Sequence, residues 1–153
     1  MQIRLKRQYI SQAVAIGLGL ECWFLAGLMN GYAAAMFIKA ANVNTGLITM
    51  SFYSPSTWLE TSSIVYTWAG MISIFYFIGS IFPGGRLSQI IRYISAIVTA
   101  VLSCYGFYLY RSYGSVDDFD TSAPLVIVSM ASVLVISCFL DFLLDRSSPG
   151  EIL

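Results

Sequence analysis

Four apolar stretches, separated by short polar connections, constrain this chain more than any other feature of its sequence. They cover about residues 12–38, 63–82, 90–110 and 124–144, and roughly 20 helical residues are enough to cross the hydrocarbon of a bilayer. Backbone N–H and C=O groups find no water there, so a crossing segment satisfies them internally as an α-helix. The sequence therefore predicts an all-α integral membrane protein, built as a four-transmembrane-helix antiparallel bundle.

Low charge supports the same class. Of the 153 residues, 10% are charged and 58% are hydrophobic, whereas a soluble domain carries about 25% charged residues. We therefore expect a single polytopic membrane domain over residues 1–153. Its outer loops would cover about residues 39–62 and 111–123, and its inner loop about residues 83–89, between the predicted helices.

The prolines agree with these boundaries. All of them lie at or beyond the ends of the apolar stretches, where the missing N–H breaks no hydrogen bond of a helix. They are Pro55, Pro83, Pro124 and Pro149.

The distribution of Lys and Arg predicts the orientation of the chain. With the N-terminus in the cytoplasm, that side of the bilayer carries Arg4, Lys6, Arg7, Arg86, Arg92 and Arg146. The outer side carries only Lys39 and Arg111. Because short cytoplasmic segments are enriched in Lys and Arg, we expect both termini to be cytoplasmic (N-in/C-in). The expected location is a plasma membrane, with the bacterial inner membrane as the first candidate.

Aromatic residues gather at the predicted outer end, and they include Phe52, Tyr53, Trp58, Trp68 and Tyr108. Trp and Tyr favour the membrane–water interface, so we expect an outer aromatic surface. Apolar and polar side chains alternate along residues 47–53, a period of two that predicts a short extended segment. This segment has three interpretations: a loop folded over the outer end of the bundle, a docking surface for a partner, or a re-entrant segment.

The first apolar stretch carries small residues at intervals of four. Gly27, Gly31 and Ala35 form a small-xxx-small series, and Gly17 projects close to the same face at about 100° per residue. A face without bulky side chains lets another helix approach closely, as in GxxxG-type contacts between membrane helices. The spacing leaves open whether the neighbouring helix belongs to this chain or to another.

Three polar residues of the predicted spans are candidates for an ion or proton site, namely Glu21, Asn30 and Asp141. A carboxylate within hydrocarbon costs several kcal/mol, so such groups usually face protein or a water-filled cavity. Glu21 is the deepest carboxyl, and together with Asn30 it flanks the small-residue face. It is therefore a candidate proton-binding or cation-binding group. The competing interpretation is a structural carboxyl that accepts hydrogen bonds from serines of the other helices.

The residue types of most catalytic and metal sites are missing or badly placed. The chain has no His, the commonest general base and metal ligand and a usual haem ligand. Cys22, Cys104 and Cys138 lie within the predicted spans without a metal-binding spacing. Eight basic residues balance eight acidic ones, which gives no basic footprint for nucleic acid. We therefore expect no catalysis, no metal, no haem or other cofactor, and no nucleic-acid partner.

Together these features favour a non-catalytic tetraspan membrane accessory or assembly subunit that packs against other membrane protein chains. Its expected partners are the lipid bilayer and either other membrane subunits or further copies of itself. The first alternative is a homo-oligomeric proton or cation transporter or channel that uses Glu21. The second alternative is an immunity-type protein that intercepts another protein within the bilayer.

Overall fold

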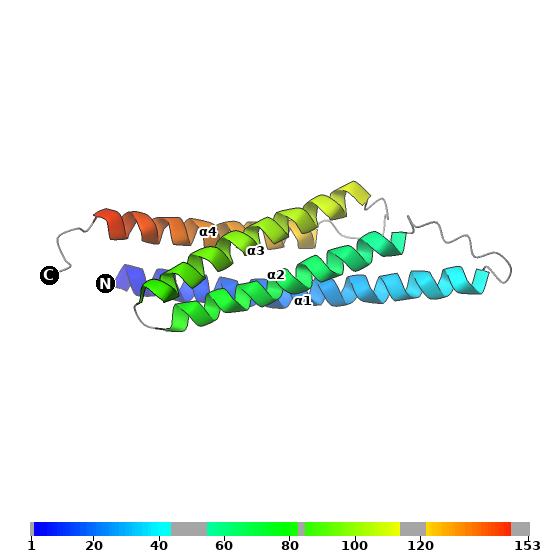
Figure 1. Cartoon of the computed structure of the whole chain (residues 1–153), viewed down its shortest axis with the longest axis horizontal. Coiled ribbons are helices and arrows are strands. Elements are labelled where there is room, and N and C mark those ends of the chain that lie inside the picture. The colour runs from blue at the N-terminus through cyan, green and yellow to red at the C-terminus, as the bar shows by residue number, and fades with distance from the viewer. Residues whose placement is uncertain (1, 44–54, 83–84, 114–121, 148–153) are drawn as a thin grey trace.

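The computed structural model of the chain describes residues 2–43, 55–82, 85–113 and 122–147. Within these residues all regular secondary structure is α-helical (Figure 1). The helices are α1 (Gln2–Val43), α2 (Pro55–Ile81), α3 (Arg86–Tyr113) and α4 (Ser122–Ser147).

Each helix contains a segment that is long and apolar enough to cross a membrane. These segments are Leu5–Gly31, Glu60–Ile81, Arg86–Arg111 and Ala123–Arg146. For the described residues, the prediction of an all-helical protein with four candidate membrane spans is therefore confirmed. Residues 47–53, for which the sequence predicts an extended segment, lie outside the described residues.

Two of the prolines mark helix starts. Pro55 is the first residue of α2, and Pro124 is the third residue of α4. The fixed φ of proline suits the first turn of a helix, where its missing N–H has no partner to lose. Pro83 and Pro149 lie outside the described residues.

Helix α1 is longer than the apolar stretch that predicts it. Its 42 residues correspond to about 63 Å at 1.5 Å per residue, and it begins at Gln2 rather than near residue 12. Figure 1 shows its far end extending past the start of α2. The extra residues at its beginning include Arg7 and Gln8, whose side chains bind α4 and α2.

The helices pack in a ring in which each contacts the next one in the chain and α4 contacts α1. Two serines join α2 to the backbone of α1. Ser73 Oγ donates to the carbonyl oxygen of Ala15 at 2.6 Å, and Ser63 Oγ donates to that of Ala26 at 3.0 Å. The start of α1 and the end of α4 lie at the same end of the molecule (Figure 1).

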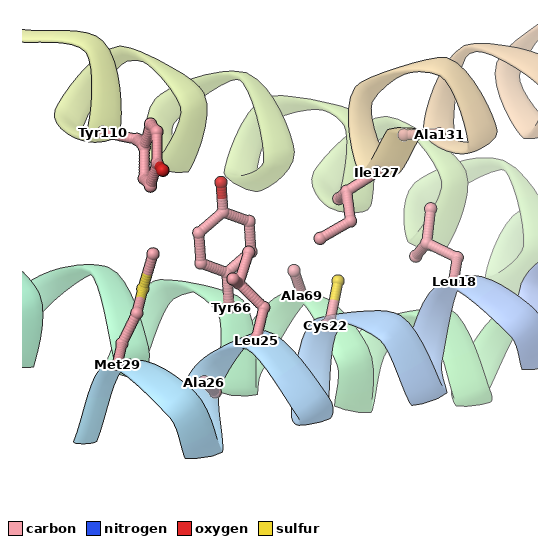
Figure 2. Close-up of a cluster of buried hydrophobic side chains, with 10 residues drawn as sticks. All are labelled: Leu18, Cys22, Leu25, Ala26, Met29, Tyr66, Ala69, Tyr110, Ile127 and Ala131. Carbon is pink, nitrogen blue, oxygen red and sulfur yellow. The ribbon is translucent and has the colours of Figure 1, made fainter. Parts of the chain in front are cut away.

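Two clusters of buried apolar side chains fill the interior. Figure 2 shows the larger one, with side chains of α1 and α2 pointing toward those of α3 and α4. It consists of Leu18, Cys22, Leu25, Ala26, Met29, Tyr66, Ala69, Tyr110, Ile127 and Ala131. The smaller cluster consists of Ala15, Tyr76, Ala96, Leu134 and Cys138. Lipid tails are as apolar as these side chains, so the hydrophobic effect does not drive the helices together within a bilayer. Close van der Waals packing between the helices stabilises their association instead.

Glycines permit the closest approaches between helices. A Cβ built on Gly70 of α2 would lie 3.1 Å from the carbonyl oxygen of Gly19 and 2.6 Å from Trp23 Nε1, both on α1. A Cβ on Gly106 of α3 would lie 2.7 Å from Cζ of Tyr66 on α2. Small residues thus bring α1 against α2, and α2 against α3, at distances that a larger residue would prevent.

Candidate functional site

The buried residues of α1 recur every three or four positions and form one face of the helix. They are Ser11, Ala15, Leu18, Gly19, Cys22, Leu25, Ala26 and Met29. At about 100° per residue, Gly31 lies roughly 180° from the centre of this face, while Glu21 and Asn30 lie on its two flanks, about 80–100° from the centre. The sequence-predicted residues of α1 therefore surround the side of the helix that points away from the bundle.

The glycines on this outward side are open. Gly27 and Gly31 are exposed, and a Cβ built on either would meet no described atom within 4 Å. Gly17 is half-buried, and a Cβ there would lie 3.9 Å from Cε of Met130 on α4. The side chain of Ala35 lies outside the described part of α1. Of the predicted small-residue face, only Gly17 thus approaches another described helix.

Glu21 and Asn30 are exposed as well. Within the described residues, neither side chain forms a hydrogen bond or an ion pair. Glu21 lies about three residues, or roughly 5 Å along the helix, beyond the middle of the candidate span Leu5–Gly31. Its carboxyl group is therefore at a depth where contact with lipid is unfavourable.

Several serines that could have donated to Glu21 bind backbone carbonyls instead. Ser73 binds Ala15 of α1. Ser129 and Ser132 each bind a carbonyl four residues earlier in α4, both at 2.9 Å. Hydroxyl groups in membrane helices commonly use their own helix in this way. A structural role for Glu21 within this chain therefore gains no support from these serines.

The predicted aromatic surface is only partly described. Trp68 and Tyr108 are exposed, on α2 and α3. Phe52 and Tyr53 lie outside the described residues, as does the side chain of Trp58.

Asp141 is placed differently from Glu21, because it lies between two arginines from other helices. Nη2 of Arg7 on α1 donates to one oxygen of the Asp141 carboxylate. Nη1 of Arg92 on α3 lies 3.5 Å from the other oxygen. The side chains of Arg7, Arg92 and Asp141 are 23%, 16% and 22% exposed, so all three are mostly buried. Asp141 thus joins α1, α3 and α4 at one end of the molecule.

Amide and hydroxyl side chains extend this cluster to α2. Gln8 Nε2 donates to the carbonyl oxygen of Ser80 at 3.0 Å. Gln89 Nε2 donates to Oδ2 of Asp145 at 3.4 Å, and Ser88 Oγ donates to the carbonyl oxygen of Gly79. All four helices therefore contribute polar groups to the same place.

These groups surround a cavity of about 370 Å³, which we call the polar cavity. Its lining consists of Arg7, Gln8, Ser80, Ile81, Phe82, Gly85, Ser88, Gln89, Arg92, Asp141, Leu144 and Asp145. Arg92 Nε is buried and has no hydrogen-bond partner among the described atoms. Groups of three or more metal-ligating side chains are not found among the described residues. The cavity therefore offers hydrogen-bond donors and carboxylates to a polar ligand.

The polar cavity cannot be recognised in the sequence. There, Arg7 and Arg92 are charges that predict orientation, and no motif marks Asp145 and Gln89 as site residues. The sequence signal that could identify them is their common position near one end of the candidate spans. Polar residues such as Gln89 and Asp145 fall near the same end of the candidate spans, so they share one level of the bilayer.

Four described helices, each long and apolar enough to cross a membrane, indicate a multi-pass helical membrane protein. Comparison of the chain with protein-family models, with curated proteins and with solved structures gives no match. Its function is therefore inferred from its own residues.

Proposed function

We propose that the chain is a non-catalytic multi-pass membrane accessory or assembly subunit that packs against other membrane protein chains through the outward side of α1. One observation carries this proposal. Glu21 and Asn30 are exposed in the candidate span of α1, beside Gly27 and Gly31, which meet no described atom.

Glu21 makes the outward side of α1 costly to expose to lipid. A carboxyl group that faces hydrocarbon costs several kcal/mol unless it is paired, so it is normally covered by protein or water. A partner helix that carries a hydrogen-bond donor would satisfy Glu21. The open glycines on the outward side of α1 would let its backbone approach closely.

We further propose that the helices form an antiparallel bundle with both termini in the cytoplasm, in the inner membrane of a bacterium. The pairing of α1 with α2 supports the antiparallel arrangement. Gln8, early in α1, pairs with Ser80, late in α2, whereas Ala26, further along α1, pairs with Ser63, early in α2. Arg7 and Arg92 lie at the same end as the start of α1, as expected for a cytoplasmic end rich in basic residues.

The separation of Glu21 from Asp141 argues against catalysis by this pair of carboxyl groups. Paired-carboxylate catalysis needs two such groups close together. Asp141 is level with Arg7, and Glu21 lies 14 residues further along α1, or about 21 Å along the helix axis. These two carboxyl groups cannot act on one substrate atom.

The test is the composition of the protein as extracted in mild detergent. We expect native mass measurement to show a complex larger than the 16.9 kDa of one chain. Gly31→Leu should remove most of that complex while the chain stays folded, because a leucine side chain would hold the partner helix away. Ser132→Leu is the matched control, since Ser132 is an exposed small residue on α4 whose hydroxyl binds a carbonyl of its own helix. A complex that survives Gly31→Leu unchanged would contradict the proposal.

A second function is favoured by the exposed position of Glu21. If the complex contains only copies of this chain, Glu21 would lie at an interface between them, and a proton or cation path could follow that interface. Vesicles that contain the wild-type protein or Glu21→Gln distinguish the two functions. A proton or cation flux that depends on Glu21 indicates a transporter or channel. Equal flux, or none, in both preparations leaves the packing role.

A further inference from the structure

The polar cavity carries balanced charge. Its lining contains two guanidinium groups, Arg7 and Arg92, and two carboxylates, Asp141 and Asp145. An anion alone would be attracted by the arginines and repelled by the carboxylates. A ligand with one negative and one positive group matches the lining as a whole.

The cavity lies at the level of lipid head groups. Its lining residues fall at the ends of candidate membrane spans, which begin at Leu5 and Arg86 and end at Ile81 and Arg146. At such positions a membrane helix passes from the hydrocarbon into the interface with water. The ligand available in the highest amount at this level is a phospholipid.

Binding groups remain in the cavity after the contacts within the chain are formed. Each guanidinium has five N–H donors, and Arg7 and Arg92 each direct one nitrogen at Asp141. Arg92 lines the cavity, and its Nε has no hydrogen-bond partner among the described atoms, so its guanidinium keeps donors that the chain itself does not use. Asp145 accepts a hydrogen bond from Gln89 at 3.4 Å, and a carboxylate has about four acceptor positions.

The rim of the cavity is apolar on one side. Ile81 and Phe82 line the cavity at the end of α2, and their side chains are 54% and 63% exposed. Acyl chains could continue from a bound head group along these side chains into the hydrocarbon. The volume of about 370 Å³ is within the range of about 300–1,000 Å³ that is usual for small-ligand sites.

We propose that the polar cavity binds the head group of a zwitterionic phospholipid with a primary ammonium, of the phosphatidylethanolamine class. The phosphate accepts hydrogen bonds from Arg92 and Arg7, and the ammonium donates to Asp145. A primary ammonium can donate to a carboxylate, whereas the quaternary ammonium of phosphatidylcholine cannot, and phosphatidylglycerol has no positive group. This site lies at the charged end of the bundle and does not depend on what covers the outward side of α1.

The proposal is tested by binding of short-chain lipids to the full chain in detergent. Dihexanoyl forms of phosphatidylethanolamine, phosphatidylcholine and phosphatidylglycerol are titrated, and the dissociation constants are measured by calorimetry. We expect phosphatidylethanolamine to bind at least tenfold more tightly than the other two. Asp145→Asn should weaken its binding at least tenfold and abolish the preference over phosphatidylcholine.

Two further variants separate the head-group contacts from general effects. Glu60→Gln removes one carboxylate from an exposed position outside the cavity, so its lipid binding should equal that of the wild type. Arg92→Lys keeps the charge but loses Nε and the planar guanidinium. Because all three lipids contain a phosphate, this variant should weaken the binding of each of them. Thermal unfolding without lipid shows whether each variant is folded.

Three results would overturn the proposal. One is equal affinity of the wild type for the three lipids. Another is unchanged binding of phosphatidylethanolamine to folded Asp145→Asn. The third is binding of free phosphoethanolamine or inorganic phosphate as tightly as the lipid, because that would assign the cavity to a soluble ligand.

Discussion

Asp141 is the residue whose environment differs most from what its position in an apolar helix suggests. Its carboxylate faces the guanidinium groups of Arg7 and Arg92, and all three side chains are mostly buried. Hydrogen bonds that involve charged groups contribute more to stability than neutral ones, about 1.5–3 kcal/mol each. A single carboxylate therefore stabilises the contact of α4 with both α1 and α3.

Replacement of this carboxylate gives a residue-scale prediction. Asp141→Asn removes the negative charge and leaves two partly buried guanidinium groups without an ionic partner. We expect the free energy of unfolding to fall by about 1–3 kcal/mol, measured by thermal unfolding in detergent and followed by circular dichroism. Glu60→Gln is the control, since Glu60 is exposed. If both variants unfold at the temperature of the wild type, the contact of Asp141 with the arginines does not stabilise the fold.

At the scale of the helices, the contact between α1 and α2 depends on two glycines. A Cβ on Gly70 would lie 2.6 Å from Trp23 Nε1 and 3.1 Å from the carbonyl oxygen of Gly19, whereas a Cβ on Gly27 would meet no described atom within 4 Å. The same substitution should therefore have different effects at the two sites. The ring of Trp23 cannot simply move away, because its Nε1 donates to the carbonyl oxygen of Thr67 at 3.3 Å.

We expect Gly70→Ala to destabilise the protein by about 1–3 kcal/mol, the usual cost of overpacking. Gly27→Ala should change the stability of the isolated chain by less than about 1 kcal/mol, since alanine is a better helix former than glycine and no neighbour is displaced. Thermal unfolding of both variants in the same detergent measures the difference. Equal stability of the two variants would show that α1 and α2 do not approach each other as closely as Gly19 and Gly70 indicate.

The glycines also show why helix contacts were harder to predict than helices. On α1, the series Ser11, Ala15 and Gly19 has the same spacing as the series Gly27, Gly31 and Ala35. Both are typical of close helix packing. Only the position of the neighbouring helix decides which series is used within the chain, and that information is not present in the spacing. In the structure, Gly19 lies against α2, whereas Gly27 and Gly31 meet no described atom.

At the scale of the whole molecule, the helices follow from the sequence, but the polar cavity does not. Hydropathy and proline positions predict the four candidate spans because these properties are local. The contact between Arg7 and Asp141 joins residues 134 positions apart, so no window along the sequence contains it. Arg7 and Gln8, which precede the predicted apolar stretch, likewise have their partners on other helices.

The proposed orientation can be tested on the whole molecule because native cysteines lie only in the candidate spans. Cys22 and Cys138 are buried, and Cys104 is exposed in the span of α3. A membrane-impermeant maleimide should therefore leave the wild-type chain unlabelled in intact spheroplasts. Lys6 and Glu60 are exposed at opposite ends of the bundle, near the start of the spans of α1 and α2. They provide positions for new thiols on each side.

We expect Glu60→Cys to be labelled in intact spheroplasts, and Lys6→Cys only after the membrane is permeabilised. This result follows from the positive-inside rule, because the end that contains Lys6 carries most of the basic residues. The measurement is the fraction of each variant that gains the mass of the reagent. The reverse pattern would place both termini outside. Labelling of both variants in sealed spheroplasts would mean that the two ends of the bundle face the same compartment, which the single crossing by α1 between Lys6 and Glu60 does not allow.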